Sequence, residues 1–311
     1  MKAAQMNGYG DASVVQIAEV DKPVADEGKV VVEVHASSIN PFDAKLRAGY
    51  MKERIPLVFP FRLGGDMAGV VVEVGAKVHD LAVGDRVYGQ AAAVAGNSGA
   101  WGEYAATAAG QVAKMPAGLS FEEAAALPMV GVSALQALTE HIHLESGQKL
   151  LVLGGAGGIG MAAIEMAKHW SVYVAATASG AGMAMARTLG ADEVIDYKAE
   201  NGTVGLRDFD AVVDTVGGQE LAKVLGVLRA GGVGVSMVGA ADPAAAKELG
   251  VSVFNQSTKV TTEALDRLRE LVEAGAVKPH VAKIFGLNQV AAAFEAWEAG
   301  GVGGKVVVKV R

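Results

Sequence analysis

The sequence predicts an α/β protein in which a β-rich module is joined to a doubly wound parallel sheet. Residues 1–120 contain short Val-rich runs broken by glycine, whereas helical patterns and short apolar runs alternate in residues 120–239. One of those apolar runs leads directly into a glycine-rich segment, LLVLGGAGGIG at 150–160. Short strands separated by turns are typical of barrels and sandwiches, and strand–helix alternation is typical of parallel sheets.

The composition excludes several classes of function. The 311 residues are 51% hydrophobic, which is enough for a large core, and the length favours two domains. A net charge of −7 argues against nucleic-acid or anionic-membrane partners, and the absence of cysteine excludes disulfides and thiolate metal sites. The first ten residues, MKAAQMNGYG, do not resemble a signal peptide, and no apolar run is long enough to cross a membrane. We therefore expect a cytoplasmic protein.

In the β-rich module, strands are expected at 29–40 and 69–78, and a turn at 81–89 leads into a third strand. The character of the chain changes at SFEEAAALP, where Ser120 and Glu123 have the spacing of a capping box at a helix start. Beyond it we expect buried strands and intervening helices. The strands are expected at 149–154, 171–177, 193–196, 209–217 and 231–239, and the helices at 160–170 and 181–190. The C-terminal part predicts helices at 261–275 and 287–300 and a strand at 304–310.

The glycine-rich segment fits a dinucleotide-binding loop. Gly155, Gly157 and Gly160 match G-x-G-x-x-G between a buried strand and an amphipathic helix. Bare backbone allows a sharp turn and close approach to a pyrophosphate, and the helix N-terminus offers free N–H groups. A plain strand–helix turn is the alternative, which this context disfavours.

The second strand of the parallel sheet bears on the choice of cofactor. NAD sites place an acid about 20 residues after the glycine loop to hold the ribose hydroxyls. Residues 166–191 contain no acid, so NADP(H) is favoured over NAD(H). Thr177 and Ser179 are expected to donate hydrogen bonds to the ribose phosphate, with Arg187 and Lys198 as the nearest candidate cations.

An ordered series of motifs resembles the zinc-independent quinone oxidoreductase branch of the medium-chain dehydrogenase/reductase superfamily. The motifs are INPFDAKLRAG (39–49), LGGDMAGVVVEVGAKV (63–78), VGDRVYG (83–89), AAALPMVGVSALQAL (124–138), LGADEVIDY (189–197), FDAVVDTVGG (209–218) and GGKVVVKV (303–310). The resemblance implies a GroES-like catalytic domain formed by 1–123 and 262–311, and a Rossmann domain at 124–261. It also implies a cofactor and substrate site in the cleft between them, and a homodimer formed through the edge strand at 231–239.

The resemblance also implies roles for individual residues. Asn40 and Tyr50 would act at the substrate, although Asn40 is alternatively a turn residue and Tyr50 a packing aromatic. The residues implied to bind the cofactor are Ser133 near the nicotinamide ribose, Ala156, Gly157, Gly158 and Ile159 at the pyrophosphate, Thr177, Ser179 and Tyr197 at the adenosine phosphate, Val216, Val238 and Phe254 near the adenine or nicotinamide, and Lys305 in the terminal G-K-V-V motif.

Zinc enzymes of the superfamily differ from this sequence at the metal ligands. Asn40 stands at the first ligand position, and residues 64–66 read Gly-Gly-Asp where Gly-His-Glu is expected. With no cysteine available, we expect no zinc. Asp66 is then expected to be structural, bonded to backbone N–H groups of a turn. Asp43, Lys45 and Arg47 are interpreted as a solvated or salt-bridged stretch.

Without a Lewis acid, the substrate must itself delocalise the negative charge that hydride transfer creates. Quinones and conjugated enals or enones do so, and Asn40 and Tyr50 would then hydrogen-bond the developing oxyanion while water supplies the proton. The sequence therefore predicts an NADPH-dependent reductase of a quinone or an α,β-unsaturated carbonyl. An enoyl thioester reductase of the same superfamily and a catalytically silent NADP(H)-binding sensor or structural protein are the alternatives.

Overall fold

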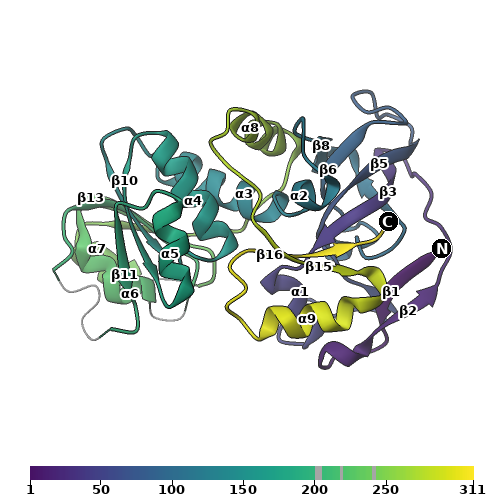
Figure 1. Ribbon diagram of the computed structural model, residues 1–311, viewed down its shortest axis with the longest axis horizontal. Helices are drawn as coiled ribbons and strands as arrows, with labels where there is room; N and C mark the ends of the chain where they lie inside the picture. The colour runs from purple at the N-terminus through teal and green to yellow at the C-terminus, as the bar shows by residue number, and fades with distance from the viewer. Residues whose placement is uncertain (200–204, 218–219, 240–242) are drawn as a thin grey trace. The chain divides into compact units, whose positions relative to one another are not determined.

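The structure is a computed structural model that describes residues 1–199, 205–217, 220–239 and 243–311 (Figure 1). Gly218, the last residue of the FDAVVDTVGG motif, lies outside the described residues. The chain divides into two units. Unit 1 comprises Met1–Met129, Val260–Glu273 and Pro279–Arg311, and unit 2 comprises Val130–Lys259 and Ala274–Lys278. The boundary falls inside helix α3 (Pro128–Gln136).

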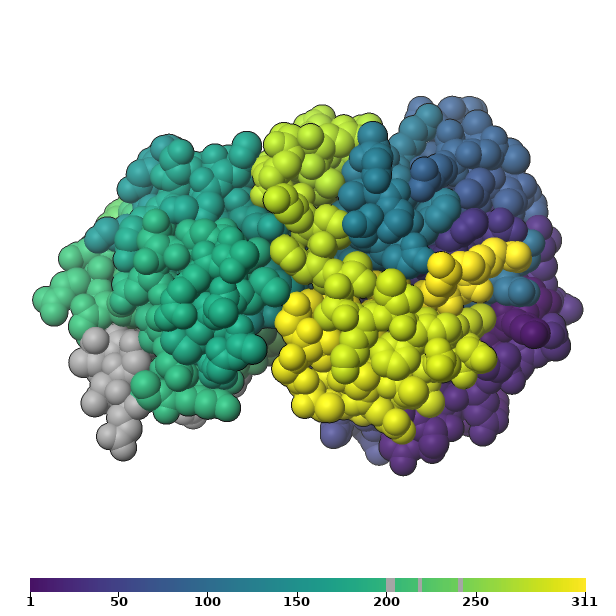
Figure 2. All heavy atoms as spheres, viewed as in Figure 1, coloured from purple at the N-terminus to yellow at the C-terminus, as the bar shows by residue number. Residues whose placement is uncertain are grey.

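Unit 1 contains a seven-stranded sheet whose centre is the Val-rich strand β3. The strand order is β15 (Val281–Gly286), β16 (Lys305–Lys309), β3 (Lys29–Ser38), β5 (Asp66–Val74), β6 (Arg86–Gln90) and β8 (Val112–Lys114), and β7 (Tyr104–Ala108) also pairs with β3. All of these pairs are antiparallel except β15–β16. β3 pairs with β16 from the far end of the chain, and Figure 2 shows the yellow C-terminal residues at the surface of this unit beside the purple N-terminal ones.

A smaller sheet and several helices complete unit 1. The sheet has the order β2 (Val15–Glu19), β1 (Lys2–Met6) and β4 (Phe61–Arg62). The α-helices are α1 (Pro41–Arg47), α2 (Phe121–Ala125), α8 (Thr262–Glu273) and α9 (Val290–Glu298), and the 3-10 turns are η1 (Ala12–Val14), η2 (Ala93–Ala95), η3 (Ala109–Gln111) and η6 (Leu287–Gln289). Trp101 and Phe294 are fully buried and meet edge to face, with ring centroids 5.1 Å apart. This contact joins α9 to the core of the β-rich unit.

Unit 2 is built on a six-stranded parallel sheet. Its order is β11 (Glu193–Asp196), β10 (Tyr173–Ala178), β9 (Lys149–Leu153), β12 (Phe209–Asp214), β13 (Leu228–Ser236) and β14 (Ser252–Asn255). Helices α4 (Gly158–His169) and α5 (Ala181–Thr188) contact strands β9 to β11, and α6 (Glu220–Val224) and α7 (Pro243–Glu248) contact strands β12 to β14. The π-helix η4 (Ala137–His141) directly continues α3, and the 3-10 turn η5 (Leu225–Val227) directly follows α6. In chain order the strands run 3-2-1-4-5-6, so the order reverses between β9 and β12.

The expected elements are present, with two differences that matter for the site. The capping box at Ser120 and Glu123 is confirmed, since each side chain accepts a hydrogen bond from the other residue's backbone N–H. The strand expected at 209–217 ends at Asp214, whose side chain caps the following turn. The prediction that 231–239 forms the edge of the sheet is wrong, because β13 pairs with the short strand β14. No helix among the described residues is long and apolar enough to cross a membrane.

Candidate active site

The glycine loop of unit 2 connects β9 to α4 at the point where the strand order reverses. The N–H groups of Gly154 and Gly155 donate to the side chain and backbone of Thr177, at 3.0 and 2.8 Å. Gly157 is the N-cap of α4, and its N–H donates to the Gly154 carbonyl at 3.0 Å. The loop is therefore tied to the neighbouring strand, and the N-terminus of a twelve-residue helix opens at its end.

The three glycines of the G-x-G-x-x-G motif are required for different reasons. A Cβ on Gly155 would lie 2.8 Å from the Ala176 Cβ, and a Cβ on Gly160 would lie 2.3 Å from the Gly154 carbonyl oxygen. Both positions are closed to side chains by the packing of the protein itself. At Gly157 the only atom near an added Cβ is the Gly154 oxygen at 3.4 Å, an ordinary contact distance. The protein does not require a glycine at 157, whereas close approach of a pyrophosphate does.

Several predicted cofactor residues lie at the carboxyl ends of the parallel strands. Ser179 follows β10, and Tyr197 follows β11 and donates its backbone N–H to the Ala178 carbonyl at 3.2 Å. Val216 and Val238 follow β12 and β13 with half-exposed side chains. Phe254 in β14 is also exposed and stacks on His141. Ligands of doubly wound sheets bind at this edge, so the structure brings these residues to the expected side of unit 2.

Two other predicted residues are occupied within unit 2. The Thr177 hydroxyl is buried and accepts the Gly154 N–H, so this side chain holds the loop. The Ser133 hydroxyl is buried and shares a hydrogen bond of 2.7 Å with the Thr258 hydroxyl. Both residues stay in the proposed cofactor site, Thr177 through the loop that it supports.

The structure adds a pair of residues that the sequence analysis did not single out. Asp214 is buried at the end of β12 and accepts hydrogen bonds from the backbone N–H groups of Val216 and Gly217, at 2.9 and 3.0 Å. It also accepts the Ser236 hydroxyl at 2.7 Å, and Ser236 accepts the Val238 N–H at 3.3 Å. One carboxylate therefore orders both loops that carry Val216 and Val238. An acid at the end of an apolar run, three residues before Gly217, was the available signal in the sequence.

Unit 1 contains a buried polar cluster around Asn40, the N-cap of α1. The Asn40 side chain donates to Asp66 Oδ2 at 2.8 Å and accepts from the Lys305 ammonium at 2.5 Å. Lys305 Nζ lies 3.6 Å from Asp66 Oδ2 and also donates to the Ile39 carbonyl at 2.8 Å. Asp66 accepts the Ser38 hydroxyl as well. Burial raises the pKa of Asp66 and lowers the pKa of Lys305, and the attraction between the two charges opposes both shifts.

The cluster corrects the interpretation of Asp43 as solvated. Asp43 is buried, and its carboxylate accepts the backbone N–H of Asn40 at 2.9 Å and of Gly64 at 3.3 Å. Burial raises its pKa to about 7, and the hydrogen bond from Asn40 acts in the opposite direction. Arg47 is salt-bridged as expected, to Glu298 at 2.6 Å, but it too is buried. The N-x-x-D spacing at the start of a helix was the signal for Asp43.

Tyr50 and Lys305 differ sharply in exposure. The Tyr50 side chain is 82% exposed after α1, and the structure shows no hydrogen bond from its hydroxyl to any described residue. Lys305 is only 6% exposed and its ammonium is held inside unit 1, so we now assign it to Asn40 rather than to a direct cofactor contact. Asp66 accepts a backbone N–H as predicted, but from Met129 of helix α3 rather than from a turn, and it also accepts the Ser38 hydroxyl and the Asn40 amide N–H.

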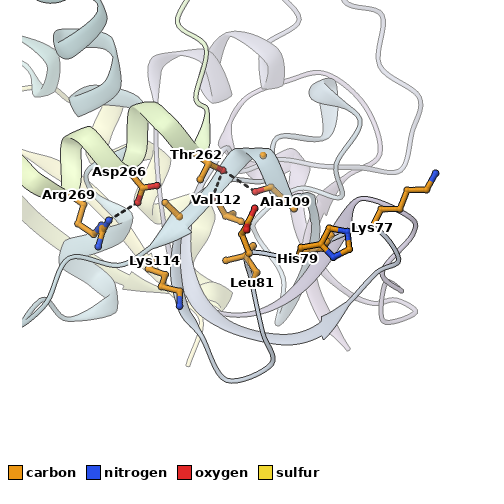
Figure 3. A pocket seen from close by; sticks show the side chains of 13 residues that line it. Lys77, His79, Leu81, Ala109, Val112, Lys114, Thr262, Asp266 and Arg269 are labelled. Carbon is orange, nitrogen blue, oxygen red and sulfur yellow. Dashed lines mark hydrogen bonds and ion pairs between the residues drawn. The ribbon is translucent and has the colours of Figure 1, made fainter.

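A hollow of about 500 Å³ in unit 1 lies away from the predicted site residues. Figure 3 shows it between the loop carrying Lys77 and His79, the strand carrying Lys114, and the helix carrying Asp266 and Arg269. Its charges have mixed signs, and Arg269 is already paired with Asp266 at 2.9 Å. None of the predicted cofactor or substrate residues lines it.

Comparison with known proteins places this geometry in a family. Residues 26–117 match the alcohol dehydrogenase GroES-like domain, and residues 189–308 match a family described as zinc-binding dehydrogenase. The chain is 38% identical to the 2-methylene-furan-3-one reductase of Solanum lycopersicum, with 99% of this chain and 79% of that protein covered. The chain belongs to the medium-chain dehydrogenase/reductase superfamily.

Two further members of the superfamily are similar over most of their length. The NADPH-dependent alkenal/one oxidoreductase, chloroplastic, of Arabidopsis thaliana is 36% identical, with 99% of this chain and 79% of that protein covered. The structure of the quinone oxidoreductase from Coxiella burnetii is 32% identical, with a TM-score of 0.91 and coverage of 100% and 99%. The predicted fold, a GroES-like domain with a Rossmann domain, and the predicted class, an oxidoreductase of this superfamily, are confirmed.

The residues at the expected zinc-ligand positions do not fit a zinc ion. Zinc takes thiolate, imidazole or carboxylate ligands, and here the carboxamide of Asn40 and the carboxylate of Asp66 surround the Lys305 ammonium. In the described part of the chain, no three His, Cys, Asp or Glu side chains are grouped closely enough to hold a metal. Independence from zinc remains a prediction.

Proposed function

We propose that the protein is an NADPH-dependent reductase that transfers hydride to a quinone or to an α,β-unsaturated carbonyl compound without zinc. The observation that carries the proposal is the glycine at position 157, where the packing of the protein itself leaves room for a side chain. The names of the similar proteins, a methylene-furanone reductase, an alkenal/one oxidoreductase and a quinone oxidoreductase, support the substrate class. A 2-methylene-furan-3-one and a quinone each contain a carbonyl conjugated to a carbon–carbon double bond.

The proposed reaction is balanced by one hydride and one proton. NADPH, when bound, supplies hydride from its nicotinamide ring. An enone takes the hydride at its β-carbon and a proton at its α-carbon, and a quinone takes both to give a hydroquinone. The Asn40 side chain donates an N–H to the substrate oxygen, where negative charge develops. Water supplies the proton, and Tyr50 is a second candidate donor to the same oxygen.

The preference for NADPH rests on the edge of unit 2 beyond β10. Ser179 and Tyr197 are adjacent there through the hydrogen bond between Tyr197 and Ala178, and no acid follows β10 before Asp192. A carboxylate at this place would repel the ribose phosphate of NADPH. The exposed Lys198, next to Tyr197, is the proposed cation for that phosphate.

The charge at the Asn40 cluster supports the proposed independence from zinc. A buried ammonium 3.6 Å from Asp66 repels a dication, and its hydrogen bond occupies the Asn40 oxygen. The chain has no cysteine to supply a thiolate.

We also propose a cytoplasmic homodimer. Its contact would involve β14, which lies at the end of the sheet and is mostly exposed.

The proposal is tested by NADPH oxidation with chelator-treated protein. A panel of benzoquinones, naphthoquinones, short enals and enones is supplied, with NADH in parallel. We expect turnover that prefers NADPH, is unchanged by chelator and occurs without bound metal by elemental analysis. No turnover with any acceptor despite saturable NADPH binding would refute the reductase. Loss of turnover on chelation with recovery on adding zinc would refute independence from zinc.

A further inference from the structure

The carboxamide of Asn40 lies between two charges of opposite sign. Its Nδ2 donates to the Asp66 carboxylate at 2.8 Å, and its Oδ1 accepts from the Lys305 ammonium at 2.5 Å. An ammonium can only donate and a carboxylate can only accept. Turning the amide over would set an N–H against the ammonium and an oxygen against the carboxylate. Only one of the two amide orientations is therefore compatible with the cluster.

Lys305 is itself fixed in place. Its ammonium donates to the Ile39 carbonyl at 2.8 Å, and β16 pairs with β3 so that Val307 lies opposite Ser38. The side chain is 7% exposed. All of these partners belong to unit 1, so the position of the ammonium is set by the β-rich unit alone.

We propose that Lys305 is a positioning residue for the reaction, which holds the Asn40 carboxamide with its unused N–H available to a substrate oxygen. This inference rests on the proposed function. The site then selects substrates that present a hydrogen-bond acceptor at this point, as a ketone, an enal or a quinone does. A group that can only donate is not matched by Asn40, because the Asn40 oxygen is already bound to the ammonium.

The expected effect of losing the ammonium follows from the freed amide. Without Lys305, the buried Asp66 has no cation beside it and is driven toward its neutral form, which can donate to the Asn40 oxygen. The amide can then turn over and present its oxygen to the substrate, which opposes a developing oxyanion. Removing one such donor in other enzymes costs about 10²- to 10³-fold in kcat. Because the freed amide still samples the productive orientation, we expect kcat to fall about 10- to 100-fold. NADPH affinity should change less than about twofold, since the glycine loop lies in unit 2.

The experiment compares substitutions of two lysines on the same strand. Lys305→Met removes the donor, and Lys309→Met removes a half-exposed lysine of β16 that pairs with Glu122 at 2.8 Å. Lys305→Gln restores a neutral donor and should recover most of the lost kcat. Since Lys305→Met leaves the buried Asp66 without its cation, the double variant Asp66→Asn/Lys305→Met removes both charges and tests the same step in a charge-balanced cluster.

The readouts are kcat and KM for a quinone and an enone, and the Kd for NADPH by fluorescence. A fall in kcat in both Lys305→Met proteins, with wild-type kcat in Lys309→Met and recovery in Lys305→Gln, supports the inference. A folded Lys305→Met protein with wild-type kcat overturns it. A fall in NADPH affinity equal to the fall in kcat also overturns it, because that result indicates a direct cofactor contact.

A second readout does not depend on turnover. In NMR spectra, the Asn40 side-chain amide protons, assigned by their loss in Asn40→Asp, should exchange slowly in the wild-type protein and at least about tenfold faster in Lys305→Met. If the wild-type protein reduces no acceptor, the proposed function fails while this comparison still decides the positioning. Unchanged exchange of the Asn40 amide in Lys305→Met overturns the inference.

Discussion

The substitution Gly157→Ala separates the needs of the cofactor from those of the fold. Gly157 has φ −82° and ψ 161°, an extended conformation open to alanine, and an added Cβ lies 3.4 Å from its nearest neighbour. As an N-cap, alanine destabilises the helix relative to glycine by up to about 1 kcal/mol. It also reduces the conformational freedom of the unfolded chain, which stabilises the folded protein by about 0.4–1 kcal/mol. The two effects oppose, so we expect stability to change by less than about 1 kcal/mol.

Cofactor binding should respond much more strongly. In the proposed site, a methyl group on Gly157 would hold the pyrophosphate away from the N–H groups at the start of α4. Losing one charge-assisted hydrogen bond costs about 1.5–3 kcal/mol, which corresponds to about 10- to 100-fold weaker binding. NADPH titration followed by fluorescence or calorimetry measures the Kd, and scanning calorimetry of the free protein measures the Tm.

Gly160→Ala is the matched control. Its Cβ would lie 2.3 Å from the Gly154 oxygen and 2.9 Å from the Gly155 Cα, both backbone atoms that cannot move aside independently. Overpacking of this kind costs about 1–3 kcal/mol, so the Tm should fall by several degrees, at about 2–4 °C per kcal/mol. Wild-type NADPH affinity in a folded Gly157→Ala protein would refute the assignment of this glycine to the cofactor.

Three other substitutions test the rest of the site. Ser179→Asp places a carboxylate after β10, so the ratio of the KM values for NADPH and NADH should rise at least about tenfold; an unchanged ratio contradicts the assignment of this edge to the phosphate. Asp214→Asn weakens the hydrogen bonds to Val216 and Gly217, so urea unfolding should show a loss of about 1–3 kcal/mol and the KM for NADPH should rise. A KM that stays at the wild-type value would limit Asp214 to a role in stability. The pKa of Asp43 is raised from 3.8 to about 7, so the folded state holds its proton where the unfolded state has lost it. The contribution of Asp43 to the free energy of unfolding is therefore complete below pH 4 and falls by about 1.4 kcal/mol per pH unit until the pH has risen through 7. Unfolding free energies at pH 5 and pH 8 should therefore differ more in the wild-type protein than in Asp43→Asn, and equal differences would contradict the raised pKa.

The parts of the site that were predictable from sequence are those with local causes. The glycine loop is set by residues within one strand–turn–helix segment, and the capping box at Ser120 and Glu123 by residues three apart. The apolar runs of unit 2 similarly predict its buried strands. The edge strand β14 was missed because Ser252–Asn255 contains only two apolar residues and most of it is exposed, so its pattern differs little from that of a loop.

The contacts of Lys305 could not be predicted in the same way. Asn40 and Lys305 are 265 positions apart, and they meet only because β16 pairs with β3. Asp43 was misinterpreted for a related reason. Its neighbours Lys45 and Arg47 suggest a solvated charge run. The N-x-x-D spacing indicates the local bond to Asn40, but only the tertiary structure shows that the carboxylate is buried and also accepts the Gly64 N–H. A single sequence carries no signal for pairings of this range.

The buried charges of unit 1 also bear on where the reaction occurs. Asp43, Asp66 and Lys305 are each at least nine-tenths buried. Burial raises the pKa of both carboxyl groups and lowers the pKa of the lysine, and each of these shifts favours the neutral form. Apolar residues of similar volume often give an equally stable or more stable core than buried ion pairs. These three buried charges lie in one cluster, and each contacts Asn40 or the residue before it. Since proteins retain such departures chiefly where a function requires them, the cluster supports Asn40 as the substrate-binding residue more strongly than its position in the N-P-x-D motif does.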